Sequence, residues 1–306
     1  MDVLPLFPSL LRCVSRVPQA TLPESLLRAA SLPVALVRAT AIDLAILAGH
    51  LFLYPAGIGQ ERRDPDLPPE ASQLPTEGRS RPPVVLLHGF VDNRSVFVLL
   101  RRSLARHGWR HLISLNYSPL TCDIRTAAAL LDRHIEEICA RTGHRQVDVV
   151  GHSLGGLIAR YYVQRLGGDS RIRTLVTLGT PHEGTAFAPL ASAHPVVRQM
   201  RPGSALIEEL RLPAPGCRTR FVSFWSDLDQ LMSPVAAACI EHPDLLTQNV
   251  RVSGVGHLAL TVHPAVAAGI RQILEDGLDD GLEGALGSGL KAGESTPDSD
   301  GTFSVA

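Results

Sequence analysis

The chain has 306 residues, of which 45% are hydrophobic, and its formal net charge at pH 7 is −1. This length fits one large α/β domain with extensions, and the hydrophobic content is enough for a sizeable core. A nearly neutral chain carries neither the basic surface that nucleic-acid binding requires nor a field that attracts acidic substrates. Its twelve histidines and five cysteines show no metal-ligand spacing, so we expect no metal site.

The five cysteines, at positions 13, 122, 139, 217 and 239, are widely spaced and odd in number. At most two disulfides can therefore form, and Cys217 with Cys239 is the least implausible pair. Free buried thiols in a reducing compartment are the favoured interpretation.

Residues 1–60 are predicted to form an apolar, helical N-terminal extension. The first eight residues lack a basic segment and contain two prolines, so no cleavable signal peptide is evident. The strongest candidate for a membrane element is residues 32–54, a nearly apolar stretch that Arg38, Asp43 and His50 interrupt. Because a charge at the bilayer centre costs about 3 kcal/mol, a membrane span is the minority interpretation. We expect a helix that contacts a membrane surface or packs against the body, in a cytoplasmic or membrane-associated protein.

The remaining composition predicts a linker, a body and a tail. Residues 61–83 are polar and rich in proline, which is typical of an extended linker. Residues 84–276 are predicted to form the folded body of the protein. Residues 277–306 are rich in glycine, serine and acidic residues, so we expect a disordered tail.

Short apolar runs alternate with helical periodicity throughout residues 84–276. The predicted strands are Val84–Leu87, Leu112–Leu115, Val147–Val150, Leu175–Leu178, Phe221–Phe224 and Val250–Val252. The predicted helices between them include Arg94–His107 and Asp123–Arg141. This alternation predicts an α/β fold with a doubly wound, mainly parallel sheet, whose active site lies at the carboxyl ends of the strands.

The most informative segment is Val147–Leu166, which contains Gly-His-Ser-Leu-Gly at residues 151–155. An apolar strand ends at Gly151 and helical spacing follows Ser153, so the serine is predicted to lie on a strand-to-helix turn. Such a turn needs glycine on both sides, because a Cβ at Gly151 or Gly155 would collide with neighbouring backbone. Ser153 would then project into a cleft as a nucleophile. The alternative is a packing turn whose serine caps the helix.

Residues 180–218 form an insertion, because the strand and helix alternation stops there for longer than an ordinary connection. Its apolar residues are Phe187, Pro189, Leu190, Val196, Val197, Met200, Leu206, Ile207 and Leu210. The length, and the place directly after a strand, favour a lid or acyl-binding wall above the site. The alternative is a helical excursion that buries its own apolar face.

A serine nucleophile needs a general base, and the base needs an acid to hold its tautomer. Both kinds of residue follow downstream. Asp227 and Asp229 come directly after the strand Phe221–Phe224, and His257 lies in a glycine-flanked loop after Val250–Val252. The residues alone leave the choice between the two acids open.

Other histidines are weaker candidates for the base. His152 adjoins Ser153, but adjacent side chains on such a turn diverge. His182 is expected to shape the rim of the pocket. His88 ends the first body strand, where the next loop turns a backbone N–H toward the site. A structural histidine is the better interpretation for each of them.

The oxyanion hole is assigned to the N–H groups of Phe90 and Leu154. Phe90 follows the first body strand, and Leu154 is the first residue after the nucleophile. The helix that begins there adds N-terminal N–H groups and the positive end of its dipole, which favour negative charge on an acyl carbonyl under attack.

Five segments of the chain together resemble α/β-hydrolase lipases and esterases of bacterial type, including small Bacillus lipases and actinobacterial triacylglycerol lipases. They are Val-Val-Leu-Leu-His-Gly-Phe at 84–90, Gly-His-Ser-Leu-Gly-Gly at 151–156, Leu-Gly-Thr-Pro-His-Glu-Gly-Thr at 178–185, Asp-Gln-Leu-Met-Ser-Pro at 229–234 and Gly-Val-Gly-His-Leu at 254–258. The order Ser, Asp, His is also that of α/β-hydrolases. The resemblance covers residues 84 to about 275 and leaves the first 60 residues and the tail outside.

The resemblance implies that Asp229 is the catalytic acid. In such lipases one variable residue and an aliphatic pair follow the acid, and Asp229-Gln230-Leu231-Met232 fits that pattern. Asp227 would then shape the loop. Some related lipases hold a structural calcium ion, but no acidic loop here can be named as its site.

We therefore expect a serine carboxylic-ester hydrolase, a lipase or esterase without a cofactor, that uses Ser153, His257 and Asp229 on a hydrophobic or lipid acyl ester. The same machinery would serve a thioesterase, phospholipase or acyltransferase, because a triad specifies attack on an acyl carbonyl rather than the acyl group. Outside enzymes, a binding module with this fold is the alternative. The intact triad argues against that alternative.

Overall fold

The computed structural model describes residues 24–57, 81–90, 92–117, 123–186 and 194–291. The described residues leave out most of the predicted linker, residues 61–83. They also leave out the end of the predicted tail, residues 292–306. Both stay predictions.

Six parallel strands form one sheet in the order β2-β1-β3-β4-β5-β6. The strands are β1 Val84–Leu87, β2 Leu112–Leu115, β3 Val147–His152, β4 Ile172–Leu178, β5 Arg220–Ser226 and β6 Leu246–Val252. Each overlaps a predicted strand, so the predicted doubly wound α/β fold is confirmed. The largest difference is at β6, which begins at Leu246 rather than Val250. Its first four residues are exposed, because β6 is an edge strand, and they therefore lack the apolar pattern of a buried strand.

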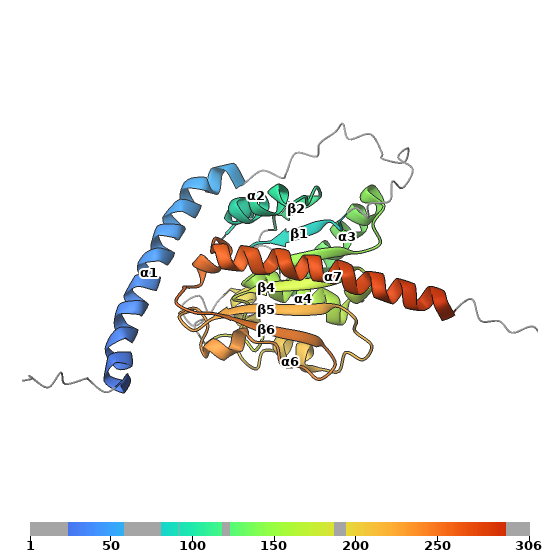
Figure 1. Cartoon of the computed structure of the whole chain (residues 1–306). Coiled ribbons are helices and arrows are strands. Elements are labelled where there is room, and N and C mark those ends of the chain that lie inside the picture. The colour runs from blue at the N-terminus through green and yellow to red at the C-terminus, as the bar shows by residue number, and fades with distance from the viewer. Residues whose placement is uncertain (1–23, 58–80, 91, 118–122, 187–193, 292–306) are drawn as a thin grey trace, which may run out of the picture.

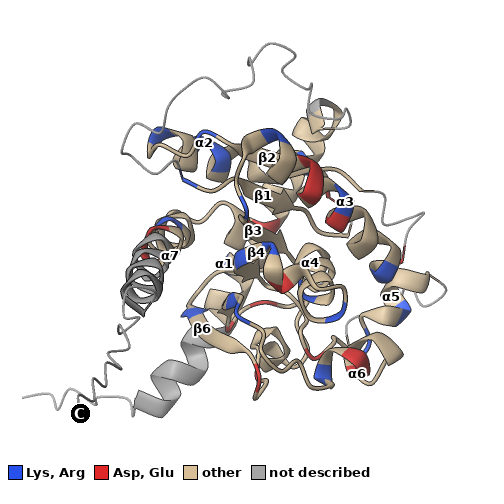
Figure 2. Ribbon diagram, turned by 90° about the vertical axis from the view of Figure 1, so that its right-hand side faces the viewer, with Lys and Arg blue, Asp and Glu red and all other residues tan. Residues whose placement is uncertain are grey.

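Helices cover both faces of the sheet, as Figure 2 shows with the sheet seen nearly end-on. The helices of the body are α2 Val98–Arg106, α3 Ile124–Thr142, α4 Leu154–Arg165, α5 Pro195–Gln199, α6 Ala205–Arg211 and α7 Pro264–Lys291. Short 3-10 helices are η1 Arg94–Phe97, η2 Gly168–Ser170, η3 Val235–Ala238 and η4 Leu258–Thr261. The sheet therefore forms the middle of three layers.

The start and end of α3 illustrate how local residues set these elements. Asp123 caps the helix, since its Oδ1 accepts the Thr126 N–H at 2.7 Å. Gly143 ends it in the left-handed region, with φ of 73°, and its N–H bonds to the Cys139 carbonyl.

Each face of the sheet has its own hydrophobic core. One core joins alternate strand residues such as Val149 and Leu175 to α3, α4, α5 and α6. The other joins residues such as Val150 and Val176 to α2 and α7. Because successive residues of a buried strand point to opposite faces, continuous apolar strands supply both cores.

In the described part of the insertion, α5 and α6 pack into the body rather than form a lid above the site. The buried residues of α5 and α6 join the core with α3 and α4; they are Val196, Val197, Leu206, Ile207 and Leu210. Buried Arg160 of α4 donates to the Leu210 carbonyl at 3.2 Å and ties α6 to α4. This matches the alternative of a helical excursion that buries its own face. Residues 187–193, which include Phe187, lie outside the described residues.

Helix α7 continues to Lys291, so residues 277–291 are helical rather than the disordered tail that the composition predicts. The sequence explains the difference, because leucine recurs every fourth residue from 274 to 290 and the glycines between do not remove that periodicity.

Of the cysteines, Cys139, Cys217 and Cys239 are described, and all three are free thiols. The pair Cys217 with Cys239 is therefore not a disulfide.

Helix α1 Glu24–Gly57 is long and lies along one side of the body (Figure 1). Among the described residues, Pro33–Pro55 is the one helical segment that is long and apolar enough to cross a membrane, with a mean hydropathy of 1.7. It also packs against the body, through η1 and η4. Ala39 and His50 are buried there, whereas Phe52 is 85% exposed.

Candidate active site

Ser153 lies on the turn between β3 and α4, as the motif predicts. Its backbone is strained, with φ of 51° and ψ of −116°, and no other non-glycine residue in the described part of the chain has a positive φ. The serine side chain does not cap α4, so the alternative of a helix-capping serine is not realised. The Ser153 N–H instead donates to the Leu178 carbonyl at 2.9 Å, which fixes the turn against β4.

The two glycines of the motif are required by contact. A Cβ on Gly151 would lie 2.6 Å from the Gly156 nitrogen, and a Cβ on Gly155 would lie 2.3 Å from the Leu87 carbonyl oxygen. Both obstacles are backbone atoms, which cannot move aside as a flexible side chain can. The first turn of α4 therefore packs directly on the end of β1.

Asp229 and His257 are in direct contact. His257 Nδ1 and Asp229 Oδ2 are 2.7 Å apart, and both side chains are buried. The other carboxylate oxygen accepts the N–H groups of Leu231 at 2.9 Å and Met232 at 3.2 Å. These bonds fix the orientation of Asp229, and Asp229 fixes His257 with Nδ1 engaged and Nε2 free to act.

Asp227, the other candidate acid, does not contact His257. Its Oδ2 lies 2.6 Å from Arg251 Nη2, and its Oδ1 accepts the Gly254 N–H at 3.1 Å. It therefore holds the loop that leads to His257. This is the loop-shaping position that the resemblance implies for it.

The Asp229–His257 pair lies over the end of β4, beside the serine turn. A Cβ on Gly179 would lie 3.0 Å from both Asp229 Oδ2 and His257 Nδ1 and would crowd the pair, and the φ of 53° at Gly179 also favours glycine. Gly179 follows Leu178, the residue that bonds the Ser153 N–H. In the described residues the Ser153 hydroxyl makes no hydrogen bond to His257. Catalytic hydrogen bonds are often long without substrate.

The surroundings of His257 favour the positively charged imidazolium form of its side chain. Burial by itself opposes the imidazolium form, but the negative charges of Asp229, Asp43 and Asp92 outweigh it. The pKa of His257 is therefore raised above its ordinary value. A base with a raised pKa accepts a proton more readily, provided that it is neutral before the reaction begins.

Phe90 and Leu154, the predicted oxyanion donors, follow adjacent strands. β1 and β3 pair in register, with Leu87 opposite Gly151, so the loop after β1 and the start of α4 meet at one edge of the sheet. The Phe90 ring lies edge-on to the His194 ring, with 5.3 Å between their centroids. The role of both residues as oxyanion donors stays a prediction.

The other histidines of the region are structural. His88 is buried, stacks on Tyr117 at 4.3 Å, and has its pKa lowered by burial. His182 is also buried, with Nε2 2.9 Å from Thr177 Oγ1, and burial together with Arg160 lowers its pKa well below the ordinary value. The expectation that His182 shapes the pocket rim is therefore wrong, because the side chain is buried rather than exposed at a rim.

A protein-family model described as the alpha/beta hydrolase fold matches residues 82–211, which include β1, the serine turn and β4. The chain has the alpha/beta hydrolase fold. Among solved structures, the mature lipase BlEst2 of Bacillus licheniformis is similar with a TM-score of 0.55 and 16% identity, over 66% of this chain and 95% of that chain. Lipase B of Aspergillus fumigatus is similar with a TM-score of 0.56 and 16% identity, over 64% and 53% of the two chains.

The chain is also a distant relative of bacterial triacylglycerol lipases. It is 29% identical over 128 residues to one from Burkholderia plantarii, which is 39% of this chain and 35% of that protein. It is 29% identical over 121 residues to one from Pseudarthrobacter phenanthrenivorans, which is 37% of each chain. The matched segments span only about a third of the length of these two relatives.

The sequence reasoning misses the place of three residues beside the candidate active site, namely Asp92, His50 and Asp43. Asp92, in the loop after β1, is buried 3.4 Å from His152 Nδ1 and 3.7 Å from His50 Nδ1 of α1. Burial alone would raise the pKa of Asp92, but the two imidazoles lower it. The His152 ring in turn lies 4.8 Å from the His257 ring. This buried chain of groups links α1 to the catalytic histidine candidate.

The third missed residue is Asp43 of α1, whose carboxylate accepts a hydrogen bond from the N–H of Ala259, two residues after His257. The sequence reasoning treats Asp43 and His50 only as costly interruptions of an apolar stretch. The available signal was spacing, since Thr40, Asp43 and His50 fall on one side of a helix.

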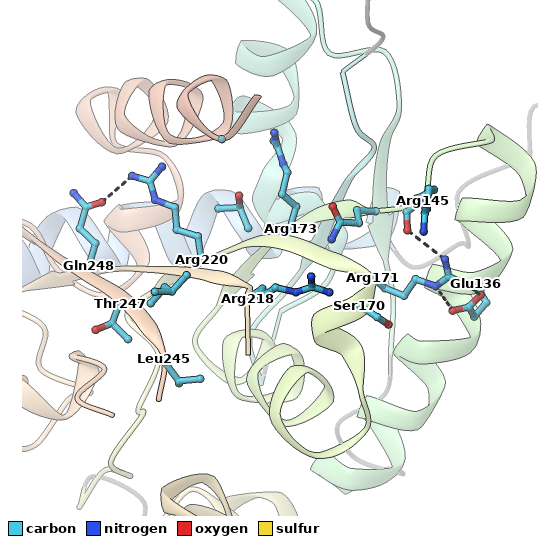
Figure 3. Close-up of a pocket in the computed structure, with 14 residues that line it drawn as sticks. Glu136, Arg145, Ser170, Arg171, Arg173, Arg218, Arg220, Leu245, Thr247 and Gln248 are labelled. Carbon is cyan, nitrogen blue, oxygen red and sulfur yellow. Dashed lines mark hydrogen bonds and ion pairs between the residues drawn. The ribbon is translucent and has the colours of Figure 1, made fainter. Parts of the chain in front are cut away.

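A large open hollow lies at the opposite end of the sheet. It has a volume of about 1420 Å³ and is lined by residues that precede or begin β3 to β6, including Arg145, Arg171, Arg173, Arg218 and Arg220 (Figure 3). Ser153 and His257 are not among its lining residues. Ligands of open α/β sheets bind at the carboxyl ends of the strands, so the hollow is separate from the candidate active site.

No group of three metal-ligating side chains occurs among the described residues.

Proposed function

We propose that the protein is a serine carboxylic-ester hydrolase of the lipase or esterase type. The observation that carries the proposal is the buried contact between Asp229 and His257, at 2.7 Å, beside a strained serine turn. The distant relationship to triacylglycerol lipases supports the same reaction class. A folded binding module has no need of this strain or of a buried acid–imidazole pair.

The reaction proceeds by two acyl transfers. His257 Nε2 takes the proton of Ser153 as Oγ attacks the ester carbonyl, and Asp229 stabilises the imidazolium that forms. The N–H groups of Phe90 and Leu154 donate to the oxyanion. His257 then protonates the leaving alcohol, and water activated by the same imidazole releases the acid from Ser153.

The experiment is hydrolysis of p-nitrophenyl esters from acetate to palmitate, with Ser153→Ala as the control. We expect activity in the wild type, a loss in kcat of about 10⁴-fold or more in Ser153→Ala, and labelling of the wild type alone by a fluorophosphonate probe. The chain-length optimum separates an esterase from a lipase. A folded wild type that is inert on every ester and unlabelled by the probe would overturn the proposal.

The same test separates the alternative acyl chemistries. A protein labelled at Ser153 that ignores oxygen esters but cleaves acyl thioesters is a thioesterase. One that acts on glycerophospholipids or transfers the acyl group to an added alcohol is a phospholipase or an acyltransferase.

We also infer that the outward face of α1 contacts a lipid surface. Val37, Leu44 and Phe52 are exposed there, at 69%, 61% and 85%. Asp43 and His50, the charged and polar interruptions, instead contact the body. Arg38 is exposed and long enough to reach lipid headgroups. An apolar face beside the site would bring a hydrophobic ester to the enzyme.

A further inference from the structure

Helix α1 contacts the active-site loops through one polar stripe. Thr40 is hydrogen-bonded to Gln230, the residue next to Asp229. Asp43 Oδ1 accepts the N–H of Ala259, two residues after His257, at 3.0 Å. His50 lies 3.7 Å from Asp92 in the loop after β1. A helix far upstream in the sequence therefore touches the loops of the acid, the base and the oxyanion donor.

Two further hydrogen bonds, to backbone carbonyls of α1, hold the C-terminal end of the helix on the body. Asn93 Nδ2 donates to the Tyr54 carbonyl at 2.9 Å, and Asn116 Nδ2 donates to the Gly57 carbonyl at 2.6 Å. Asn93 lies in the loop after β1, next to Asp92, and Asn116 directly follows β2. They hold the helix on the body independently of Asp43.

Asp43 supplies a cap that the histidine loop lacks. His257 is the N-cap residue of η4, but its own side chain makes no capping bond. The orphan Ala259 N–H at the start of η4 is satisfied instead by the carboxylate of Asp43. The bond fixes the backbone on the C-terminal side of His257.

The backbone on the N-terminal side of His257 packs on the same carboxylate. A Cβ on Gly256 would lie 2.2 Å from Asp43 Oδ2 and 2.6 Å from Asp43 Oδ1. Gly256 does not have a positive φ, so an alanine is compatible with its backbone, and the Asp43 carboxylate would have to move to make room for it. Asp43 thus holds both sides of the residue that carries the imidazole.

We propose that Asp43 is a positioning residue for His257, so that α1 is part of the catalytic apparatus. Its carboxylate holds the His257 backbone through Ala259 and Gly256, and it places a second negative charge near the imidazole. This inference rests on the proposed function, because it assigns Asp43 a role through the base of that reaction.

The charge of Asp43 distinguishes this role from that of a structural cap. The titratable groups that face His257 are Asp229 from the acid loop, Asp43 from α1, Asp92 from the loop after β1 and His152 from β3. Burial lowers the pKa of His152. The carboxylate of Asp43 favours the charged form of His257, so its removal should lower the pKa of His257.

The experiment measures kcat, KM and the pH profile of kcat/KM for Asp43→Asn and Asp43→Ala in the full chain. Asparagine keeps an oxygen for the Ala259 N–H but removes the charge. We expect Asp43→Asn to keep kcat within about threefold and to move the acidic limb of kcat/KM to lower pH by about 0.5 to 1 unit. Asp43→Ala should also lower kcat by about tenfold or more with little change in KM, because the loop loses its cap.

Asp227→Asn is the matched control. It also removes a carboxylate that accepts an N–H of the same loop, at Gly254, but Asp227 makes no contact with His257. We expect the acidic limb of this variant to stay where it is in the wild type.

A second comparison tests the contact with Gly256. Gly256→Ala should lower kcat by about tenfold in the wild type, because its Cβ meets the Asp43 carboxylate. In the Asp43→Ala background the same substitution should cost less, because the obstacle is gone. Equal costs in the two backgrounds would contradict the proposed contact.

The outcomes separate this inference from the proposed function. Activity that survives Ser153→Ala defeats the proposed function itself. If the wild type is active, Ser153→Ala is inactive and Asp43→Asn leaves the acidic limb unchanged, the triad stands and the role of Asp43 is overturned. Asp43→Asn decides this even if Asp43→Ala fails to fold, since the isosteric variant keeps the capping bond.

Discussion

Two charged pairs at opposite ends of the parallel sheet differ in their exposure to water. At the amino end, Arg171 and Glu136 form an ion pair at 2.6 Å whose side chains are 35% and 47% exposed. At the carboxyl end, His257 and Asp229 form a pair at 2.7 Å whose side chains are 3% and 1% exposed. The distances are nearly equal, and the difference between the pairs is access to water.

That difference decides what each pair can do. Water and salt screen the charges of an exposed pair, so each charge has little effect on the other. In a buried pair the charges interact strongly, which shifts a pKa and fixes an orientation. The carboxyl end is also the end that α1 covers, through η1 and η4, while the amino end remains open as the hollow of Figure 3.

The largest effect that tests this comparison is expected at the two neighbouring acids. Asp229→Asn should lower kcat by about 10⁴-fold, because the amide cannot hold the His257 tautomer or stabilise the imidazolium. Asp227→Asn should lower it by less than about threefold, because Asp227 pairs with the exposed side chain of Arg251. Steady-state kinetics on a short ester measure both.

Circular dichroism and fluorophosphonate labelling serve as controls, to show that each variant is folded and retains Ser153. Similar losses in the two variants would mean that burial does not separate the acids, and the assignment of Asp229 would have to be given up.

An intermediate effect is expected on the outward face of α1. Phe52→Glu together with Leu44→Glu should weaken co-sedimentation with anionic phospholipid vesicles by at least about tenfold, because burying such side chains contributes roughly 1.5 to 3 kcal/mol each. Hydrolysis of a soluble short ester should not change, since neither side chain is buried against the body.

Leu212→Glu is the matched control for this experiment, because Leu212 is 54% exposed but lies after α6 rather than on α1. Vesicle binding that is equally weak in the control, or equally strong in the α1 variant, would show that α1 does not mediate the contact.

Most of the fold is predictable from the sequence because its signals are local. Buried parallel strands read as continuous apolar runs, and the motif around Ser153 marks its turn within five residues. The contact that requires Gly151 is equally local, whereas Gly155 is required by the Leu87 carbonyl of a distant strand. The contact between Asp229 and His257 matches the pairing that the resemblance implies. Their catalytic roles, and those of Ser153, Phe90 and Leu154, stay predictions until activity is measured.

What the sequence does not predict depends on contacts distant along the chain. Asp43 and His50 look like defects in an apolar helix, because the groups they meet, Ala259 and Asp92, lie far away in sequence. The exposed start of β6 lacks an apolar pattern because it is at an edge. In each case tertiary contacts, rather than local preference, determine the structure.

The smallest effect is expected at the exposed pair of the amino end. Arg171→Gln, Glu136→Gln and the double variant should leave kcat unchanged, because neither side chain lines the active site and both are partly in water. Their melting temperatures should match that of the wild type within error at 0.15 M salt, since Coulomb attraction between exposed charges is largely offset by side-chain entropy and screening. Thermal denaturation at low and high salt checks this. A clear coupling between the two substitutions that survives high salt would show that this exposed pair is shielded as the His257–Asp229 pair is, and burial would no longer account for the contrast between the two pairs.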